Sequence, residues 1–180
     1  MTVKYELTLE DYLDFNIYHV MQSKTARQAL LVQRIMVAMI FVALPLVINR
    51  IVGIDLKTWM PMSLFMAVLA FLFYRNFFEA NIKKNLVKIL AEGSPAGIIG
   101  RHKISFDEEE IVERNERGKA TISWSNVEKF AENGQSFFLY YSPENAYIIP
   151  FRAFRDPAHR EEFIDMVERY LPARSRLNKE

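Results

Sequence analysis

Two long apolar stretches stand out in the pattern of hydrophobic and polar positions. Residues 35–48 (IMVAMIFVALPLVI) and 59–74 (WMPMSLFMAVLAFLFY) contain no charged side chain and would be apolar on every face of a helix. A bilayer core needs about 20 apolar residues, so both stretches are slightly short. Basic side chains near their ends can reach the interface and close the gap: Arg34, Arg50, Lys57 and Arg75. The pattern therefore predicts two membrane helices, over residues 29–54 and 56–78.

A helical hairpin buried in a soluble core is the alternative interpretation. A soluble core helix usually keeps a polar stripe, and neither stretch has one. Trp59 and Tyr74 lie at opposite ends of the second stretch, where aromatic belts form in membrane helices. The sequence therefore favours a membrane hairpin.

Basic residues gather outside the hairpin rather than in its connection. The flanking residues are Lys24, Arg27 and Arg34 before the first helix, and Arg75, Lys83, Lys84 and Lys88 after the second. The connection carries only Arg50 and Lys57. By the positive-inside rule, this bias predicts a multi-pass membrane protein with both termini in the cytoplasm. Residues 1–10 lack the apolar core of a signal peptide, so we expect the internal helices to direct insertion.

The N-terminal residues combine a strand pattern with a helix start. Apolar and charged residues alternate over residues 3–7, which predicts a short strand. Such a strand cannot stand alone, so we expect it to pair with the sheet of the C-terminal half. Thr8 is a typical N-cap, and Asp11 lies in the first turn of the amphipathic helix that follows.

The C-terminal half changes to short alternating segments separated by turns. These segments predict six strands, over residues 99–106, 111–114, 119–124, 127–131, 136–141 and 146–149. Asn133-Gly134 predicts a type I′ hairpin turn, which needs positive φ at both positions. Asp156 followed by Pro157 predicts the start of a helix that ends at Pro172. An antiparallel sheet or partial barrel with a C-terminal helix is typical of pleckstrin-homology-like domains.

The predicted fold class is a membrane α-helical hairpin plus an α+β soluble domain. Residues 1–28 form the N-terminal strand and amphipathic helix, on the cytoplasmic side, and residues 29–78 form the two-helix transmembrane hairpin. Residues 79–97 form a basic helical extension and linker. Residues 98–172 form the pleckstrin-homology-like cytoplasmic domain, and residues 173–180 form a basic tail.

Four short segments carry a resemblance to a known family. They are residues 5–12 (YELTLEDY), 100–106 (GRHKISF), 123–127 (SWSNV) and 149–154 (IPFRAF). In this order, around two membrane helices, they resemble the YcxB-like family of small bacterial membrane proteins. That resemblance implies a C-terminal domain similar to bacterial pleckstrin-homology folds and a location in the cell inner membrane, and it implies no established activity. Family members often carry an acid where Asn126 stands and a lysine where Phe151 stands.

Composition excludes several classes of function. The chain has 23 Lys+Arg against 22 Asp+Glu, so it lacks the basic footprint of a protein that binds nucleic acid. It has no cysteine, which removes disulfides, thiolate metal sites and cysteine nucleophiles. The sequence contains neither a glycine-rich phosphate loop nor a nucleophile elbow. We therefore expect a protein that is not an enzyme and has no cofactor, catalytic residue or metal site.

A few side chains remain as candidates for binding. Arg75, Lys83, Lys84, Lys88 and Arg152 are possible contacts for anionic lipid or phosphate. We call the first four of these residues, which follow one another on a predicted helix, the basic collar (Arg75, Lys83, Lys84 and Lys88). The basic collar can equally be a topology signal on a solvated helix face. Arg152 can equally pair with an acid of the protein itself.

Other candidates have ordinary structural interpretations. Residues 107–110 (DEEE) could hold a cation, but a solvated turn is favoured because calcium-loop spacing is absent. Trp124 could anchor a ligand, but a core position is favoured. The three histidines, His19, His102 and His159, have no metal-binding or nucleophilic partner at a suitable spacing.

Three classes of function follow from this architecture. The favoured hypothesis is a membrane-anchored adaptor that presents its cytoplasmic domain to a protein partner or to anionic membrane lipid. The first alternative is a membrane-surface enzyme whose site forms on oligomerisation. The second is a small channel built by homo-oligomerisation, with Ser63, Ala67 and Ala70 as its few candidate pore residues. A central charge in an apolar stretch, the usual mark of a transport pathway, is absent.

Overall fold

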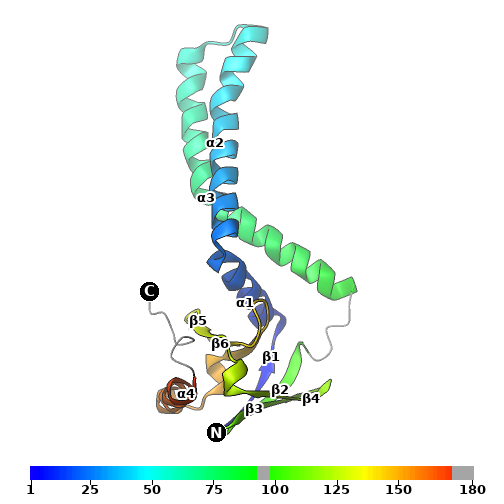
Figure 1. The fold of residues 1–180 in the computed structure, drawn as a ribbon. Coiled ribbons are helices and arrows are strands. Elements are labelled where there is room, and N and C mark those ends of the chain that lie inside the picture. The colour runs from blue at the N-terminus through cyan, green and yellow to red at the C-terminus, as the bar shows by residue number, and fades with distance from the viewer. Residues whose placement is uncertain (93–97, 172–180) are drawn as a thin grey trace. The chain divides into compact units, whose positions relative to one another are not determined.

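The computed structural model describes residues 1–92 and 98–171. It divides into two compact units, one formed by Met1–Tyr18 with Leu90–Glu180 and the other by His19–Ile89. The helices are α1 (Leu9–Gln22), α2 (Lys24–Val52), α3 (Leu56–Glu92) and α4 (Pro157–Tyr170) (Figure 1). The predictions of a linker up to residue 97, of a helix end at Pro172 and of a basic tail lie outside the described residues.

The strands form two antiparallel sheets. The first, of order β1-β2-β3-β4, contains Thr2–Leu7, Gly100–Phe106, Glu110–Asn115 and Gly118–Ser123. The second, of order β5-β6-β7, contains Lys129–Glu132, Ser136–Tyr140 and Ala146–Pro150. Two 3₁₀ turns, η1 (Trp124–Asn126) and η2 (Phe151–Ala153), follow β4 and β7. The six C-terminal strands that the sequence predicts are confirmed, with shifts of one to two residues at several ends.

The N-terminal strand is part of the C-terminal sheet, as predicted. β1 pairs antiparallel with β2, and its register places Val3 opposite Ile104 and Leu7 opposite Gly100. Val3 and Leu7 are buried, because alternate side chains of a strand point to the same face. The two long helices α2 and α3 are thus inserted between two neighbouring strands of one sheet.

The main core lies where the two sheets and α4 meet. Phe163 and Val167 of α4 are fully buried, and the Phe163 ring contacts Phe106, Phe137 and others at centroid distances of 5.2 and 5.3 Å for these two. α4 begins as the sequence predicts, because Asp156 Oδ1 accepts a hydrogen bond from the His159 amide at 2.8 Å. This helix therefore closes the core with its apolar stripe.

A second cluster joins the start of α1 to the other face of the three-stranded sheet. Phe15 of α1 contacts Phe138 and Tyr140 of β6 at ring distances of 5.2 and 5.7 Å. Thr8 caps the helix as predicted: its backbone N–H and hydroxyl donate to Asp11 Oδ2 at 2.7 Å, and its Oγ1 accepts from the Asp11 amide at 3.3 Å. β1 and α1 are therefore fixed to the domain by both sheets.

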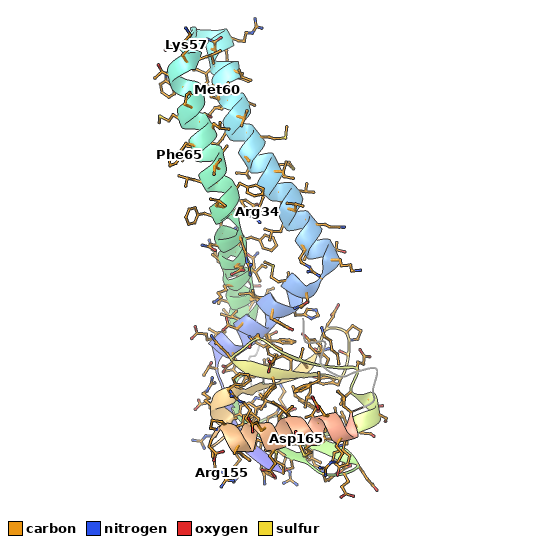
Figure 2. The ribbon with its side chains drawn as sticks, turned by 90° about the vertical axis from the view of Figure 1, so that its left-hand side faces the viewer. Arg34, Lys57, Met60, Phe65, Arg155 and Asp165 are labelled. Carbon is orange, nitrogen blue, oxygen red and sulfur yellow. The ribbon has the colours of Figure 1, made fainter. Side chains whose placement is uncertain are left out.

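The second unit contains two helices that are long and apolar enough to cross a membrane, of 29 and 37 residues. Within the most apolar 18-residue segment of each helix, only 6% of the residues are buried. Figure 2 shows side chains of this hairpin, Phe65 among them, projecting outward. Helix α2 begins earlier than residue 29, because Ser23 caps it, and it ends at Val52 because Gly53 takes a left-handed conformation with φ of +73°. Pro45 and Pro61 are accommodated inside the helices.

Polar contacts join the helices of this hairpin, among them a hydrogen bond from the Tyr74 hydroxyl to Gln33 Oε1 at 3.3 Å. Arg34 Nε of α2 donates to the Phe71 carbonyl of α3 at 2.8 Å, and its guanidinium lies over the Phe71 ring at 4.3 Å from the centroid. The Ser63 hydroxyl donates to the Phe41 carbonyl. Arg34 therefore supports the hairpin from inside, rather than acting only as a snorkelling residue as its position in the sequence suggested.

The β5–β6 turn differs from the type I′ turn that the sequence predicted. Gly134 has φ of +82°, but no residue other than glycine has positive φ in the described chain, so Asn133 does not meet the type I′ requirement. Asn133 Oδ1 instead accepts backbone hydrogen bonds from Gln135 and Ser136 at 3.0 and 2.9 Å. The prediction of a hairpin was right, and the turn type was wrong because the asparagine side chain closes the loop.

Candidate ligand pocket

A pocket of about 460 Å³ opens between the two sheets on the side away from α4. Its lining comes from all four strands of the first sheet, from β7, from the β6–β7 turn and from α1. Every lining residue belongs to the same compact unit. The size lies within the range of about 300–1,000 Å³ that is usual for small-molecule sites.

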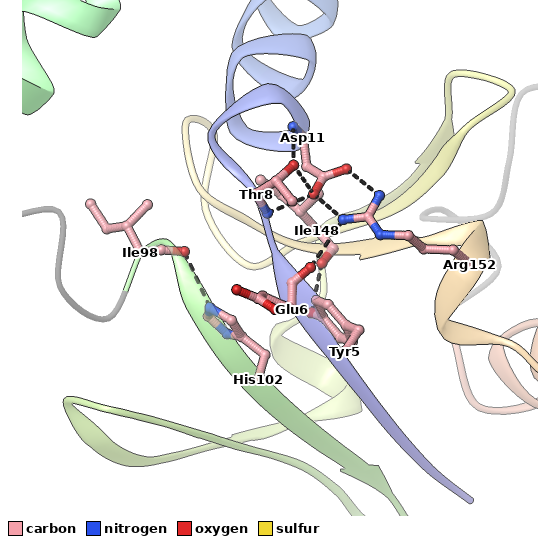
Figure 3. Close-up of polar contacts among 8 residues, drawn as sticks. All are labelled: Tyr5, Glu6, Thr8, Asp11, Ile98, His102, Ile148 and Arg152. Atoms are coloured by element: carbon pink, nitrogen blue, oxygen red, sulfur yellow. Dashed lines mark hydrogen bonds and ion pairs between the residues drawn. The ribbon is translucent and has the colours of Figure 1, made fainter.

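His102 and Glu113 form a buried ion pair at the base of this pocket. His102 of β2 lies on the same face of its strand as the buried Ile104, and Glu113 of β3 lies on the same face as the buried Ile111 and directly opposite Ile104. His102 is only 6% exposed, and its Nδ1 lies 2.7 Å from Glu113 Oε1. Its Nε2 lies 3.1 Å from the Ile98 carbonyl, which Figure 3 shows. Both ring nitrogens therefore face oxygen acceptors, and neither is available to a ligand.

Tyr5 connects the His102–Glu113 pair to the second sheet. Its ring stacks on the His102 ring with a centroid distance of 5.7 Å and an interplanar angle of 12°. Its hydroxyl donates to the Ile148 carbonyl of β7 at 2.6 Å, a contact drawn in Figure 3. Burial raises the pKa of Tyr5 well above its usual value, and the Glu113 carboxylate raises that pKa further. The phenol therefore stays neutral.

Two further tyrosines of the pocket lining contact each other. Tyr141 and Tyr147 pack with ring centroids 4.9 Å apart, and Tyr147 is 6% exposed. Burial raises the pKa of both phenols, and the field of Glu113 adds to each shift. Both hydroxyls thus lie within the electrostatic influence of Glu113 and remain protonated.

Polar atoms in this pocket that have no hydrogen-bond partner within residues 1–92 and 98–171 include one from each sheet. One is the Tyr147 hydroxyl, although its side chain is nine-tenths buried. The other is Glu113 Oε2, on a side chain that is 14% exposed and uses Oε1 for His102. Buried polar groups normally have a partner, so both atoms mark places where a ligand or ordered water completes the network.

The arrangement suits binding better than proton transfer. His102 has no free ring nitrogen, and the three tyrosines are held as neutral phenols, so none of them is prepared to act as a base. Within the described chain, His, Cys, Asp and Glu side chains form no group of three or more that could hold a metal ion. Chemically, the buried part of the pocket offers neutral hydroxyls and the carboxylate of Glu113.

Arg152, a predicted candidate for phosphate, is engaged inside the protein. From η2 it donates Nη1 to Asp11 Oδ1 at 2.7 Å and Nη2 to Asp11 Oδ2, and Nη2 also donates to the Glu6 carbonyl at 3.0 Å (Figure 3). Such a two-pronged pair satisfies most of the guanidinium. The structure thus agrees with the alternative interpretation, in which Arg152 pairs with an acid of the protein.

We predict that this pair makes stability depend on acid pH. Burial raises the pKa of Asp11, but hydrogen bonds from Arg152 and Thr8 outweigh it and hold the pKa below its usual value. A carboxyl group whose pKa is lowered by folding stabilises the folded state above about pH 4. This contribution is lost as the pH falls through the pKa of Asp11 in the folded state. Asp11→Asn should therefore unfold about 1 kcal/mol more easily at pH 7, since solvent screens the exposed arginine.

The measurement is urea unfolding of the purified chain and of Asp11→Asn between pH 7 and pH 3. The difference between the two proteins should stay constant down to about pH 5 and shrink below about pH 4. Glu10→Gln, on the exposed side of the same helical turn, is the matched control and should show no such difference. A difference that persists unchanged at pH 3 would contradict this explanation.

The basic collar lies on α3, in the second compact unit. Arg75 Nε contacts Glu79 Oε1 at 2.7 Å, one helical turn along. Lys84 and Lys88 are exposed and Lys83 is half-buried. The pocket lining includes none of the five residues predicted as anion contacts.

The remaining candidates have structural roles. Trp124 is buried, and its Nε1 donates to the Asp107 carbonyl at 2.9 Å. Asp107 Oδ1 accepts from the amides of Glu109 and Glu110, which makes the acidic segment a capped turn and lowers the Asp107 pKa. His159 Nδ1 accepts from the Arg155 amide at 3.4 Å.

Sequence reasoning overlooked Glu113 and the pocket tyrosines. The signal was available in the strand alternation, because it places Glu113 on the same face as Ile111 and His102 on the same face as Ile104. A charged residue at an inward position is uncommon, so two of them on neighbouring strands predict a buried pair. The tyrosines gave no such signal, because their convergence depends on how the two sheets pack.

Comparison with known proteins gives a match to one family model. Residues 106–167 match the family model described as YcxB-like protein. The match runs from the end of β2 into α4, and it confirms the predicted family resemblance over that segment. No curated protein and no solved structure gives a significant match to the chain.

Proposed function

We propose that this chain is a non-enzymatic, membrane-anchored binding module. In this proposal, α2 and α3 form a transmembrane hairpin in the bacterial inner membrane. The strands, α1 and α4 form a pleckstrin-homology-like domain on the cytoplasmic side, which presents its surface and pocket to a partner or ligand. The single observation that carries the proposal is the pairing of β1 with β2 across the inserted hairpin.

That pairing constrains the membrane topology. Leu7 at the end of β1 lies opposite Gly100 at the start of β2, so the chain leaves and re-enters the domain at one place. A segment inserted in this way must cross a membrane an even number of times. Two crossings by α2 and α3 meet that requirement, and this argument is independent of the charge bias around the helices.

The hairpin surface supports the membrane assignment. Large apolar side chains are exposed along both helices, for example Met39, Ile51, Phe65 and Phe73, each more than 59% exposed. An exposed apolar surface of this extent needs lipid or protein to cover it. The basic residues outside the hairpin favour the cytoplasm for the domain.

The order of strands supports the pleckstrin-homology-like assignment. A four-stranded and a three-stranded antiparallel sheet enclose one core, and a C-terminal helix packs into it. The chemistry of the pocket favours binding over catalysis, because its histidine and its tyrosines are held by hydrogen bonds, burial and the field of Glu113.

Cysteine labelling in intact bacteria tests this topology, because the chain has no cysteine of its own. We expect Lys57→Cys, in the first turn of α3 next to the connection with α2, to react with a membrane-impermeant maleimide added to intact cells. Glu128→Cys, an exposed position just before β5, should react only after the membrane is opened. The native protein serves as the unlabelled control.

Two results would overturn the topology. Labelling of Glu128→Cys in intact cells would place the domain outside the cytoplasm. Recovery of the chain in the supernatant after high-speed centrifugation, without detergent, would remove the membrane hairpin altogether.

A further inference from the structure

We propose that the pocket between the two sheets binds a primary ammonium group, carried by a zwitterionic ligand whose anionic group lies at the rim. This proposal rests on the binding role proposed above and gives it a ligand class. It does not depend on the membrane topology, because every residue involved belongs to one compact unit.

The deep end of the pocket presents oxygen acceptors to a ligand. Glu113 Oε2 has no partner within the described chain, and the Tyr147 hydroxyl has none either. Tyr5 has donated its hydroxyl hydrogen to Ile148 and keeps lone pairs that can accept. A primary ammonium has three N–H donors and no acceptor, so it matches three acceptor oxygens.

The hydrogen-bonding groups at this end favour a cation over an anion. Both ring nitrogens of His102 donate, to Glu113 and to the Ile98 carbonyl, so the imidazolium offsets the charge of the carboxylate and its N–H donors are already used. An anion placed here would therefore face the second carboxylate oxygen of Glu113 without a donor from His102, whereas an ammonium can donate to that oxygen. Neutral phenol rings also attract a cation through their faces.

The rim adds a preference for a negative group farther out. Arg117 and Lys119, from the β3–β4 hairpin, line the opening, against one acid, Glu144, from the β6–β7 turn. The basic side chains therefore outnumber the acid at the rim, whereas the base carries a carboxylate. A ligand with an ammonium at one end and a phosphate or carboxylate at the other follows this polarity. Phosphoethanolamine has this chemistry, both as a free molecule and as a lipid headgroup.

Isothermal titration calorimetry on the full-length chain in detergent micelles tests the proposal. The probes are phosphoethanolamine, ethanolamine and inorganic phosphate. We expect phosphoethanolamine to bind most tightly and ethanolamine more weakly. Any binding of inorganic phosphate should be the same in the native chain and in a variant that lacks the Glu113 carboxylate. Nanodiscs of phosphatidylethanolamine or phosphatidylglycerol then separate the two sources of the headgroup, since only a lipid ligand gives a preference between them.

Three variants divide the contributions. Glu113→Gln keeps the shape of the side chain and removes its charge, and it should weaken phosphoethanolamine binding about tenfold, since a hydrogen bond to a charged group is lost. Lys119→Ala should weaken phosphoethanolamine about threefold and leave ethanolamine unchanged. Glu132→Gln, an exposed acid of β5 outside the lining, is the matched control and should bind as the native chain does.

A further substitution tests the proposal if the Glu113→Gln variant does not fold. If thermal unfolding shows that Glu113→Gln is not folded, Tyr147→Phe removes one acceptor with little change of volume and should weaken ethanolamine severalfold. Equal binding by the native chain and both variants would overturn the proposal, and so would phosphate binding as tightly as phosphoethanolamine. Such results leave the cysteine-labelling result unaffected, so failure of the ligand class is distinguishable from failure of the topology.

Discussion

Residues 98–180 produced alone should fail to fold, although they contain six of the seven strands. Without β1, the β2 edge of the first sheet loses its partner strand, and the core loses the buried side chains Val3 and Leu7. The loss of one ladder and two buried side chains is similar in size to the stability of an ordinary domain, about 5–15 kcal/mol. Far-ultraviolet circular dichroism and a thermal scan of the purified fragment are the measurements, and we expect no cooperative transition.

Joining β1 back to the fragment should restore folding. In the test protein, residues 1–22 are linked to residue 98 by a flexible Gly/Ser segment in place of the hairpin. This protein should remain in solution without detergent and unfold cooperatively. A matched version with Val3→Asp places a charge opposite Ile104 in the core and should not fold. If the fragment without β1 unfolds cooperatively, the strand is an accessory rather than a part of the core.

Phe163→Ala in the intact chain should destabilise the domain by about 3–5 kcal/mol. The ring is fully buried and contacts aromatic rings from β2, β5, β6 and Phe154, the residue after η2, so no single neighbour can move in to fill the space. Urea unfolding followed by the fluorescence of Trp124, in a Trp59→Phe background, measures this loss. Trp124 is a suitable reporter because it packs beside Phe106.

Phe163→Leu provides the matched control, since it keeps an apolar side chain of similar length. It should cost much less than the alanine variant, about 1–1.5 kcal/mol. Alanine at Ile164, a half-buried neighbour on the same helix, should also cost less. If Phe163→Ala and Ile164→Ala lowered the free energy of unfolding by similar amounts, α4 would cover the core without the Phe163 ring being a main part of it.

Much of this fold could be predicted from local patterns. The apolar stretches predicted both long helices, because a helix that is apolar on all faces has few alternatives. The alternation of residues 3–7 predicted a strand, and its inability to stand alone correctly assigned it to the C-terminal sheet. Asp156 and Thr8 predicted two helix starts through hydrogen bonds that involve only neighbouring residues.

The features that could not be predicted depend on contacts between distant residues. Arg152 is separated by most of the chain from Asp11, so the sequence could not choose between an internal acid and an external phosphate. The pocket required both sheets to be placed, because Tyr5 and Tyr147 come from opposite ends of the sequence. At Asn133, the backbone preference of the Asn-Gly pair was correct for a turn but could not decide how the side chain would bond.

The insertion of the hairpin between β1 and β2 also determines when the domain can form during synthesis. The ribosome releases β1 first, and β2 follows only after residues 8–99 have been made. At about 5–20 residues per second, that interval lasts roughly 5–20 s. Both apolar helices emerge during this wait, so in the proposed topology they reach the bilayer while the first strand is still unpaired. In that topology, any delay in insertion exposes an open strand and the apolar hairpin together, and delivery to the membrane is the step that protects this chain from aggregation.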